Sequence, residues 1–324
     1  MSDMDPLLHL LIPYAGARAD GARAALAALE LPRLARLLAR LGPAGSDSGE
    51  EDSLSPPHER ALARAFGLDA PDGALPLAAL AAWQAGSTSA EVPGEQPCGW
   101  ITPCHWRVGT DRIVLYDPAD LALGADESQA LLAAMAPFFE EDGLPLRYLA
   151  PARWLARGEP LRGLATASLD RVIGHNIQAL APQAATSRVL HRLQNEMQML
   201  LYTHPVNDLR QARGLLPVNS FWVSGTGVLA TPPAPDLAPP QQPQGLRDAA
   251  VRQDWTAWAE AWRALDAGPC AALLAAAEAG RPVRLTLCGE RNALAFDSAS
   301  RPGLARRLLN LFGPKPVSDV LLSL

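Results

Sequence analysis

The chain opens with a short apolar run that leads directly into helical periodicity. Residues 7–12 read LLHLLI, which predicts a buried strand. The following stretch, GARAALAALELPRLARLLARLG, has apolar residues at helical spacing on both sides of Pro32. Because proline is disfavoured inside a helix, we expect two short helices that meet there. A strand that leads into helices is how an α/β layer begins, so the sequence predicts an α/β fold.

The next segments are mostly polar. Residues 42–57, GPAGSDSGEEDSLSPP, are acidic and rich in Ser and Pro, which predicts a mobile loop. Helical patterns follow at 59–66 and 75–83, and a polar connector is expected at 86–97.

Strands and helices alternate through the middle of the chain. Residues 98–117 are rich in β-branched and aromatic side chains around a Gly-Thr-Asp turn, which predicts a hairpin. A helix is expected over 125–141, because acids occupy its first turn and apolar residues follow at helical period. We also expect short strands within 144–156, an amphipathic helix over 186–204 that Pro205 ends, and a strand at 219–225.

The last third begins with a proline-rich segment, ATPPAPDLAPPQQPQG at 230–245, which predicts an exposed linker or lid. A helix follows with Trp255, Trp258 and Trp262 spaced i, i+3 and i+7, and we interpret this stripe as a packing face. An Ala-rich helix, the strands RPVRLTLCG and NALAFD, and a closing helix at 304–309 complete the pattern.

Composition excludes several classes of protein. The 324 residues are 48% hydrophobic and 19% charged, as in globular proteins, and this length favours two lobes. A net charge of -6 argues against nucleic acid as a partner. No run approaches the roughly 18 apolar residues of a membrane span, so we expect no membrane association. The four cysteines lack zinc-ribbon spacing, which favours reduced thiols in the cytoplasm.

One segment carries a resemblance to a known family. HPVNDLRQARGLLPVNSFWVSGTG, residues 204–227, resembles the His-Pro-hydrophobic-Asn, Leu-Pro-x-Asn and Gly-x-Gly motifs of archaeal-type cofactor-independent phosphoglycerate mutases. These enzymes belong to the alkaline-phosphatase superfamily. Looser, collinear similarity extends back to residue 7 through ELPRLARLLARLG, PAGSDSG and CGWITPCHWRVGTDRIVLYD. The chain is also similar to RpfE-type regulatory proteins.

The resemblance implies a specific architecture. It implies an alkaline-phosphatase-like sheet with helices on both faces, formed by residues 1–97 and 215–324. It also implies a second, inserted α+β lobe at 98–214, with 230–245 as a linker. The matching segment would then be the return from the lobe into the sheet, and such junctions are where ligands bind.

Residues near this junction are therefore candidates for binding a ligand: His204, Asn207, Arg210, Arg213 and Asn219. Arg210 and Arg213 are three apart, which places them on one face of a helix. Such a pair can clamp a phosphate or carboxylate, and solvation at the surface is the alternative. The ligand implied by the resemblance is a small phosphorylated acid.

Catalysis in the family runs through a phosphoserine held by two divalent metals, because the metals neutralise the transferring group. Ser46, in GSD, falls where the family has its nucleophile, and the alternative is that it is a solvated loop serine, as serines in acidic loops usually are. The first strand should end in an Asp-Gly metal ligand, but residues 13–15 read Pro-Tyr-Ala. No histidine follows His204, so the expected Asp-His motifs are missing. We expect no metal site and no cofactor.

Three functional hypotheses follow. The leading one is a catalytically degenerate phosphoglycerate-mutase-like protein that acts in the cytoplasm as a regulatory or ligand-binding module. The second is an active phosphoryl-transfer enzyme, a mutase or phosphatase, that uses Ser46 with Mn or Mg. The third is an interaction scaffold that binds a protein partner through the segment 230–245 or the tryptophan-bearing helix.

Overall fold

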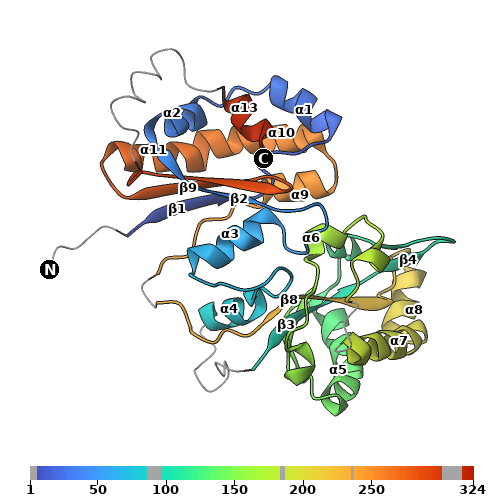
Figure 1. Ribbon diagram of the computed structural model, residues 1–324. Helices are drawn as coiled ribbons and strands as arrows, with labels where there is room; N and C mark the ends of the chain where they lie inside the picture. Colours follow the sequence, from blue (N-terminus) through green and yellow to red (C-terminus); the bar gives the residue numbers. More distant parts are fainter. Residues whose placement is uncertain (1–5, 86–95, 183–186, 235–236, 301–315) are drawn as a thin grey trace. The chain divides into compact units, whose positions relative to one another are not determined.

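The computed structural model describes residues 6–85, 96–182, 187–234, 237–300 and 316–324. The chain divides into two compact units (Figure 1). The first comprises Met1–Asp52, Pro56–Gly67 and Ala234–Leu324, and the second comprises Ser53–Ser55 and Leu68–Pro233. Each unit has its own four-stranded sheet, so the predicted mixed α/β class is confirmed.

The sheet of the first unit has the strand order β1-β9-β10-β2. The first strand, β1 (Leu8–Ile12), pairs in parallel with β9 (Val283–Cys288). The next strand, β10 (Asn292–Asp297), runs antiparallel to both β9 and β2 (Gly42–Ser48). The three strands predicted from LLHLLI, RPVRLTLCG and NALAFD are therefore present.

Helices lie on both sides of this sheet. On one side lie α1 (Asp20–Ala27), α2 (Pro32–Arg40), α10 (Trp255–Leu265), α11 (Ala271–Glu278) and α13 (Val317–Leu322), and on the other lies α3 (Pro57–Ala65) (Figure 1). The unit also contains α9 (Gly245–Val251) and a π-helical turn, Asp266–Cys270. Pro32 occupies the first turn of α2, where its missing N–H costs nothing. The two-helix prediction is confirmed.

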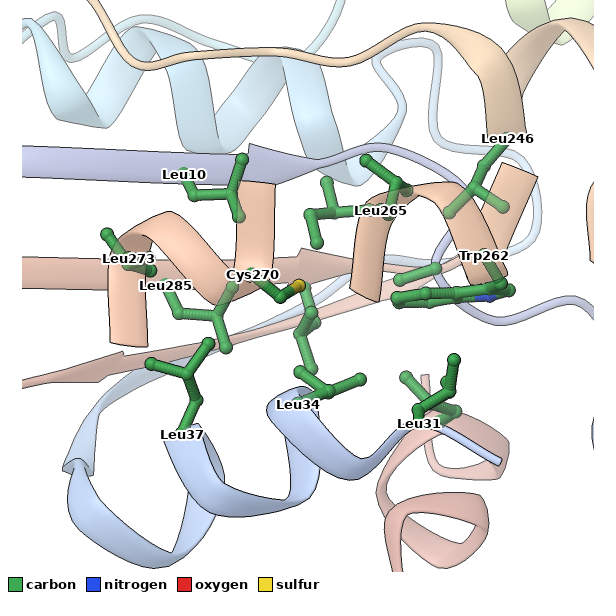
Figure 2. Packing of buried hydrophobic residues seen from close by; sticks show 14 of the residues in the cluster. Leu10, Leu31, Leu34, Leu37, Leu246, Trp262, Leu265, Cys270, Leu273 and Leu285 are labelled. Atoms are coloured by element: carbon green, nitrogen blue, oxygen red, sulfur yellow. The ribbon is translucent and has the colours of Figure 1, made fainter. Parts of the chain in front are cut away.

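The main core of this unit lies between the sheet and the larger helical layer. Leu34 and Leu37 of α2 point toward Leu285 of β9, with Cys270 and Trp262 beside them (Figure 2). All five are buried. This confirms that the tryptophan stripe is a packing face. A smaller apolar cluster on the opposite face joins α3 to the sheet.

The segment 42–57 is not the loop that its composition predicts. Residues Gly42–Ser48 form β2, an edge strand in register with β10, with Ser46 opposite Leu294. Polar residues and glycines are weak strand formers, so the strand is specified by the neighbour to which it bonds. Polar side chains on an edge also suit its exposed position.

The second unit has an antiparallel sheet of order β6-β7-β3-β8. These strands are β3 (Cys98–Cys104), β6 (Leu146–Ala150), β7 (Arg153–Arg157) and β8 (Ser220–Gly227). The predicted hairpin is present as β4 (Trp106–Val108) and β5 (Ile113–Leu115), which pair around a turn.

Helices cover the two faces of this second sheet. Side chains of α5 (Ala125–Glu141) and α7 (Arg188–Tyr202) pack on one face, and α4 (Leu77–Gln84) packs on the other. Pro205 does end the predicted helix, but it also begins another, α8 (Pro205–Ala212). Shorter elements are α6 (Leu169–Val172) and 3-10 turns at Pro118–Leu121, Glu159–Leu161 and Ile177–Ala179.

The borders of the compact units differ from the predicted division at 98 and 214. Both α4 and β8 belong to the second unit, because β8 pairs with β3 and α4 packs against both strands. Within the predicted linker 230–245, Gln241 hydrogen-bonds to the backbone of His9 and Leu11 along the edge of β1. Most of the predicted connector at 86–97 and the helix at 304–309 lie outside the described residues.

No helix among the described residues is both long enough and apolar enough to cross a membrane.

Candidate functional site

The two arginines of the predicted clamp converge on a carboxylate of the chain itself. Arg210 is fully buried, and its guanidinium donates to Glu127 of α5 (Nη1 to Oε2, 2.5 Å) and to the carbonyls of Leu121 and Leu216. Arg213 is exposed and donates to the other oxygen of Glu127 (3.1 Å). The two arginines therefore share one carboxylate, and it belongs to a side chain of the protein, Glu127.

The other three predicted binding residues also bond to nearby backbone. Asn207 is buried and bonds to both backbone groups of Val218 (2.7 and 2.9 Å). Asn219 bonds in the same two-way manner to the backbone of Trp106 (2.7 and 2.9 Å). His204 caps α8 by accepting a backbone N–H, and burial lowers its pKa. These contacts fasten α8 and β8 within the second unit.

Ser46, the predicted nucleophile, lies on β2 in the first unit. Successive side chains of a strand point to opposite faces, so Ser46 and Asp47 face different sides of the sheet. Asp47 faces α3, where it forms ion pairs with Arg60 (2.7 Å) and Arg64 (2.5 Å). Ser46 belongs to the first unit, whereas the five residues above belong to the second.

A cavity of about 180 Å³ lies between the sheet of the first unit and α3. Its charged and polar side chains are those of His9, Asp47, Arg64, Arg284 and Thr286, and its remaining lining is alanine, glycine and Ser46, whose side chain points to the other face of the sheet. His9 comes from β1 and hydrogen-bonds through Nε2 to the Thr286 hydroxyl of β9 at 2.9 Å. Of these residues, only Ser46 was predicted from the sequence as a site residue.

His9 is electrically neutral at pH 7. Burial is the main cause, and the positive charge of Arg284 adds to it; together they lower the pKa of His9 to about 4. A neutral imidazole can donate one hydrogen bond and accept another. The cavity thus contains a polar histidine-threonine pair without a charge of its own.

His9, which is partly buried, should give the stability of the fold a specific pH dependence. In the unfolded chain His9 has a pKa of about 6.5 and is protonated below that pH. In the folded chain it becomes protonated only near pH 4. The free energy of unfolding should therefore fall as pH falls through this window, by up to about 3 kcal/mol. The His9→Gln variant should lose this contribution, as measured by urea denaturation at pH 7 and pH 4.5. Parallel pH profiles for wild type and variant would contradict the assignment.

The carboxyl end of β1, where the family resemblance implies a metal ligand, is occupied by packed side chains and backbone. Tyr14 adopts a left-handed conformation (φ 52°), and its carbonyl accepts a hydrogen bond from the indole of Trp258 (3.0 Å). Leu321 and Leu324 are buried, and both lie beside Gly16 in this turn. A Cβ on Gly289, at the end of β9, would lie 2.5 Å from that of Leu324.

Within the described residues, no three His, Cys, Asp or Glu side chains form a group that could hold a metal ion. The expectation of a protein without a metal site stays a prediction.

Comparisons with known proteins give distant structural similarity only. No protein-family model and no curated protein matches the chain. Among solved structures, it is similar to the cofactor-independent phosphoglycerate mutase from Thermoplasma acidophilum DSM 1728, with 15% identity and a TM-score of 0.35 over 99% of both chains. It is also similar to the PH0037 protein from Pyrococcus horikoshii, with 12% identity and a TM-score of 0.45 over 94% of this chain and 92% of that one.

Proposed function

We propose that this protein is a phosphoglycerate-mutase-like module that binds a small phosphorylated acid in the cytoplasm and has lost two-metal phosphoryl transfer. In this proposal the first unit corresponds to an alkaline-phosphatase-like domain. The observation that carries the loss of catalysis is the filled carboxyl end of β1. In sheets with parallel strands, this is the end at which ligands bind.

Two features of the turn after β1 support this proposal. First, Pro13, Tyr14 and Ala15 supply no carboxylate where the family resemblance calls for an Asp-Gly ligand. Second, Ala15 is fully buried and donates its N–H to the carbonyl of Cys288 (2.7 Å), which ties the turn to the end of β9. Two divalent ions need several oxygen or nitrogen ligands, and apolar groups packed at this position offer none.

The proposal predicts that the purified protein does not interconvert 3- and 2-phosphoglycerate, even with added manganese. The reason is that a transferring phosphoryl group would lack the cations that neutralise its charge. The measurement is a coupled mutase assay with manganese, with magnesium and with a chelator. Manganese-dependent turnover that Ser46→Ala abolishes would refute the proposal, and a Ser48→Ala variant controls for damage to β2.

Ligand binding is tested separately by thermal unfolding with increasing 3-phosphoglycerate. A ligand at 100 times its dissociation constant stabilises the folded state by about 2.7 kcal/mol. For a chain of this size, that should raise the melting temperature by several degrees. A saturable rise that is independent of manganese supports a binding module. Unchanged melting would remove the ligand from the proposal.

A further inference from the structure

The cavity beside α3 has hydrogen-bond donors that the described protein groups do not use. Arg284 lines the cavity, and one nitrogen of its guanidinium donates a hydrogen bond to Asp297 (Nη2 to Oδ2, 3.1 Å). Its Nε–H is buried and has no hydrogen-bond partner among the described residues. A buried donor without an acceptor is unfavourable and uncommon in folded proteins. An oxygen atom from a ligand would satisfy it.

The charges around the cavity favour an anion. Arg60 and Arg64 share the single carboxylate of Asp47, and Arg284 pairs with Asp297. Among the residues that line the cavity, Arg64 and Arg284 carry positive charges and Asp47 alone carries a negative one. An arginine carries five N–H donors, so Arg64 and Arg284 retain donors after these ion pairs form.

The rest of the lining restricts the size of a ligand. Ala61 and Ala65 of α3 and Ala293 and Ala295 of β10 leave space without competing charge. The volume of about 180 Å³ is below the roughly 300–1,000 Å³ typical of pockets for drug-sized ligands. It suits a single small acid group with a few attached atoms.

The geometry points to this cavity as a binding site for a small oxyanion, the phosphate or carboxylate group of a metabolite, held between Arg284 and Arg64. The neutral pair of His9 and Thr286 supplies further polar contacts. The site involves the first half of β1 and the flank of α3, and is separate from the filled carboxyl end of β1. This inference rests on the proposed function where the bound anion is the phosphorylated acid. The two are tested separately, because the calorimetry and the cavity variants test the site, whereas the mutase assay tests the loss of catalysis.

The test is isothermal titration calorimetry of the full chain at pH 7 and constant ionic strength. The titrants are inorganic phosphate, 3-phosphoglycerate and glycerate, with glycerol as the neutral control. We expect saturable binding of at least one anion, and no binding of glycerol. Phosphate and glycerate as separate titrants distinguish recognition of the phosphate group from recognition of the carboxylate.

Three variants place the binding in the cavity. Arg284→Gln removes the charge and the unpaired donor, and should weaken anion binding at least tenfold. Ala295→Leu keeps both arginines but fills space, and should weaken it comparably even if Arg284→Gln folds poorly. Arg36→Gln, on an exposed arginine that pairs with Glu278, is the matched control and should bind as wild type does.

The imidazole of His9 provides a second readout. An anion beside it favours the protonated form, so saturating phosphate should raise the pKa of His9 measured by NMR titration. Absence of any saturable binding, or undiminished binding to both cavity variants, would overturn the site. If both cavity variants bound the anion as wild type does and the protein had no mutase activity, the proposed binding function would stand, but the anion would bind outside this cavity.

Discussion

Replacing Arg210 with methionine is expected to lower the free energy of unfolding by about 3–5 kcal/mol, because it removes one partner of a buried ion pair. Glu127 would lose its 2.5 Å contact, and the carbonyls of Leu121 and Leu216 would lose their donor. The measurement is urea denaturation at pH 7, followed by circular dichroism. The size of the effect follows from burial, since Arg210 is 0% exposed.

Arg213 is the matched control, because it contacts the same carboxylate from the surface. Its side chain is 63% exposed, and exposed ion pairs contribute only about 0.2–1 kcal/mol. Arg213→Gln should therefore unfold nearly as wild type does. If both variants kept wild-type stability but lost stabilisation by 3-phosphoglycerate, the two arginines would be ligand-binding residues instead of structural ones.

Trp258→Ala is the second change expected to have a large effect, a loss of about 3–5 kcal/mol in the free energy of unfolding. Trp258 is fully buried and stacks edge-on between Trp255 and Trp262. Its indole N–H also bonds to the carbonyl of Tyr14, whose left-handed backbone is strained for a residue with a bulky side chain. The variant therefore loses packing and a support of the turn after β1.

Phenylalanine variants separate these two losses. Trp258→Phe keeps a ring but leaves the Tyr14 carbonyl without its donor, whereas the indole N–H of Trp262 has no hydrogen-bond partner among the described residues. Trp258→Phe should therefore destabilise by about 1 kcal/mol more than Trp262→Phe. Equal losses in urea denaturation would mean that the hydrogen bond to the turn contributes little.

Much of the fold could be predicted because its signals are local. Acids in the first turn fixed the start of the helix Ala125–Glu141, and Pro32 marked the break between α1 and α2. The strand β2 could not be predicted in this way, since GPAGSDS has the composition of a loop and becomes a strand only through its ladder with β10. The borders of the units depend on similarly distant pairings.

The cavity was harder to predict, because its parts come from opposite ends of the sequence. His9 and Thr286 are 277 positions apart and meet only when β1 pairs with β9. A partial signal was present: Arg284 and Thr286 lie two apart in VRLTLC, so they share a face of a strand. A polar pair on one face of an apolar strand indicates a polar site on that face of the sheet, although it does not identify the neighbouring strand that completes the site.

The pairing of β1 with β9 also has a consequence for synthesis on the ribosome. The second unit is almost continuous in sequence, from Leu68 to Pro233, so its sheet can form before β9 has been translated. The apolar strand β1 emerges before the second unit, yet its partner follows about 275 residues later, since Leu8 pairs with Val283, a delay on the order of tens of seconds. During that delay the apolar segment LLHLLI lacks the strand with which it pairs in the folded protein, so it is exposed to binding by a nascent-chain chaperone.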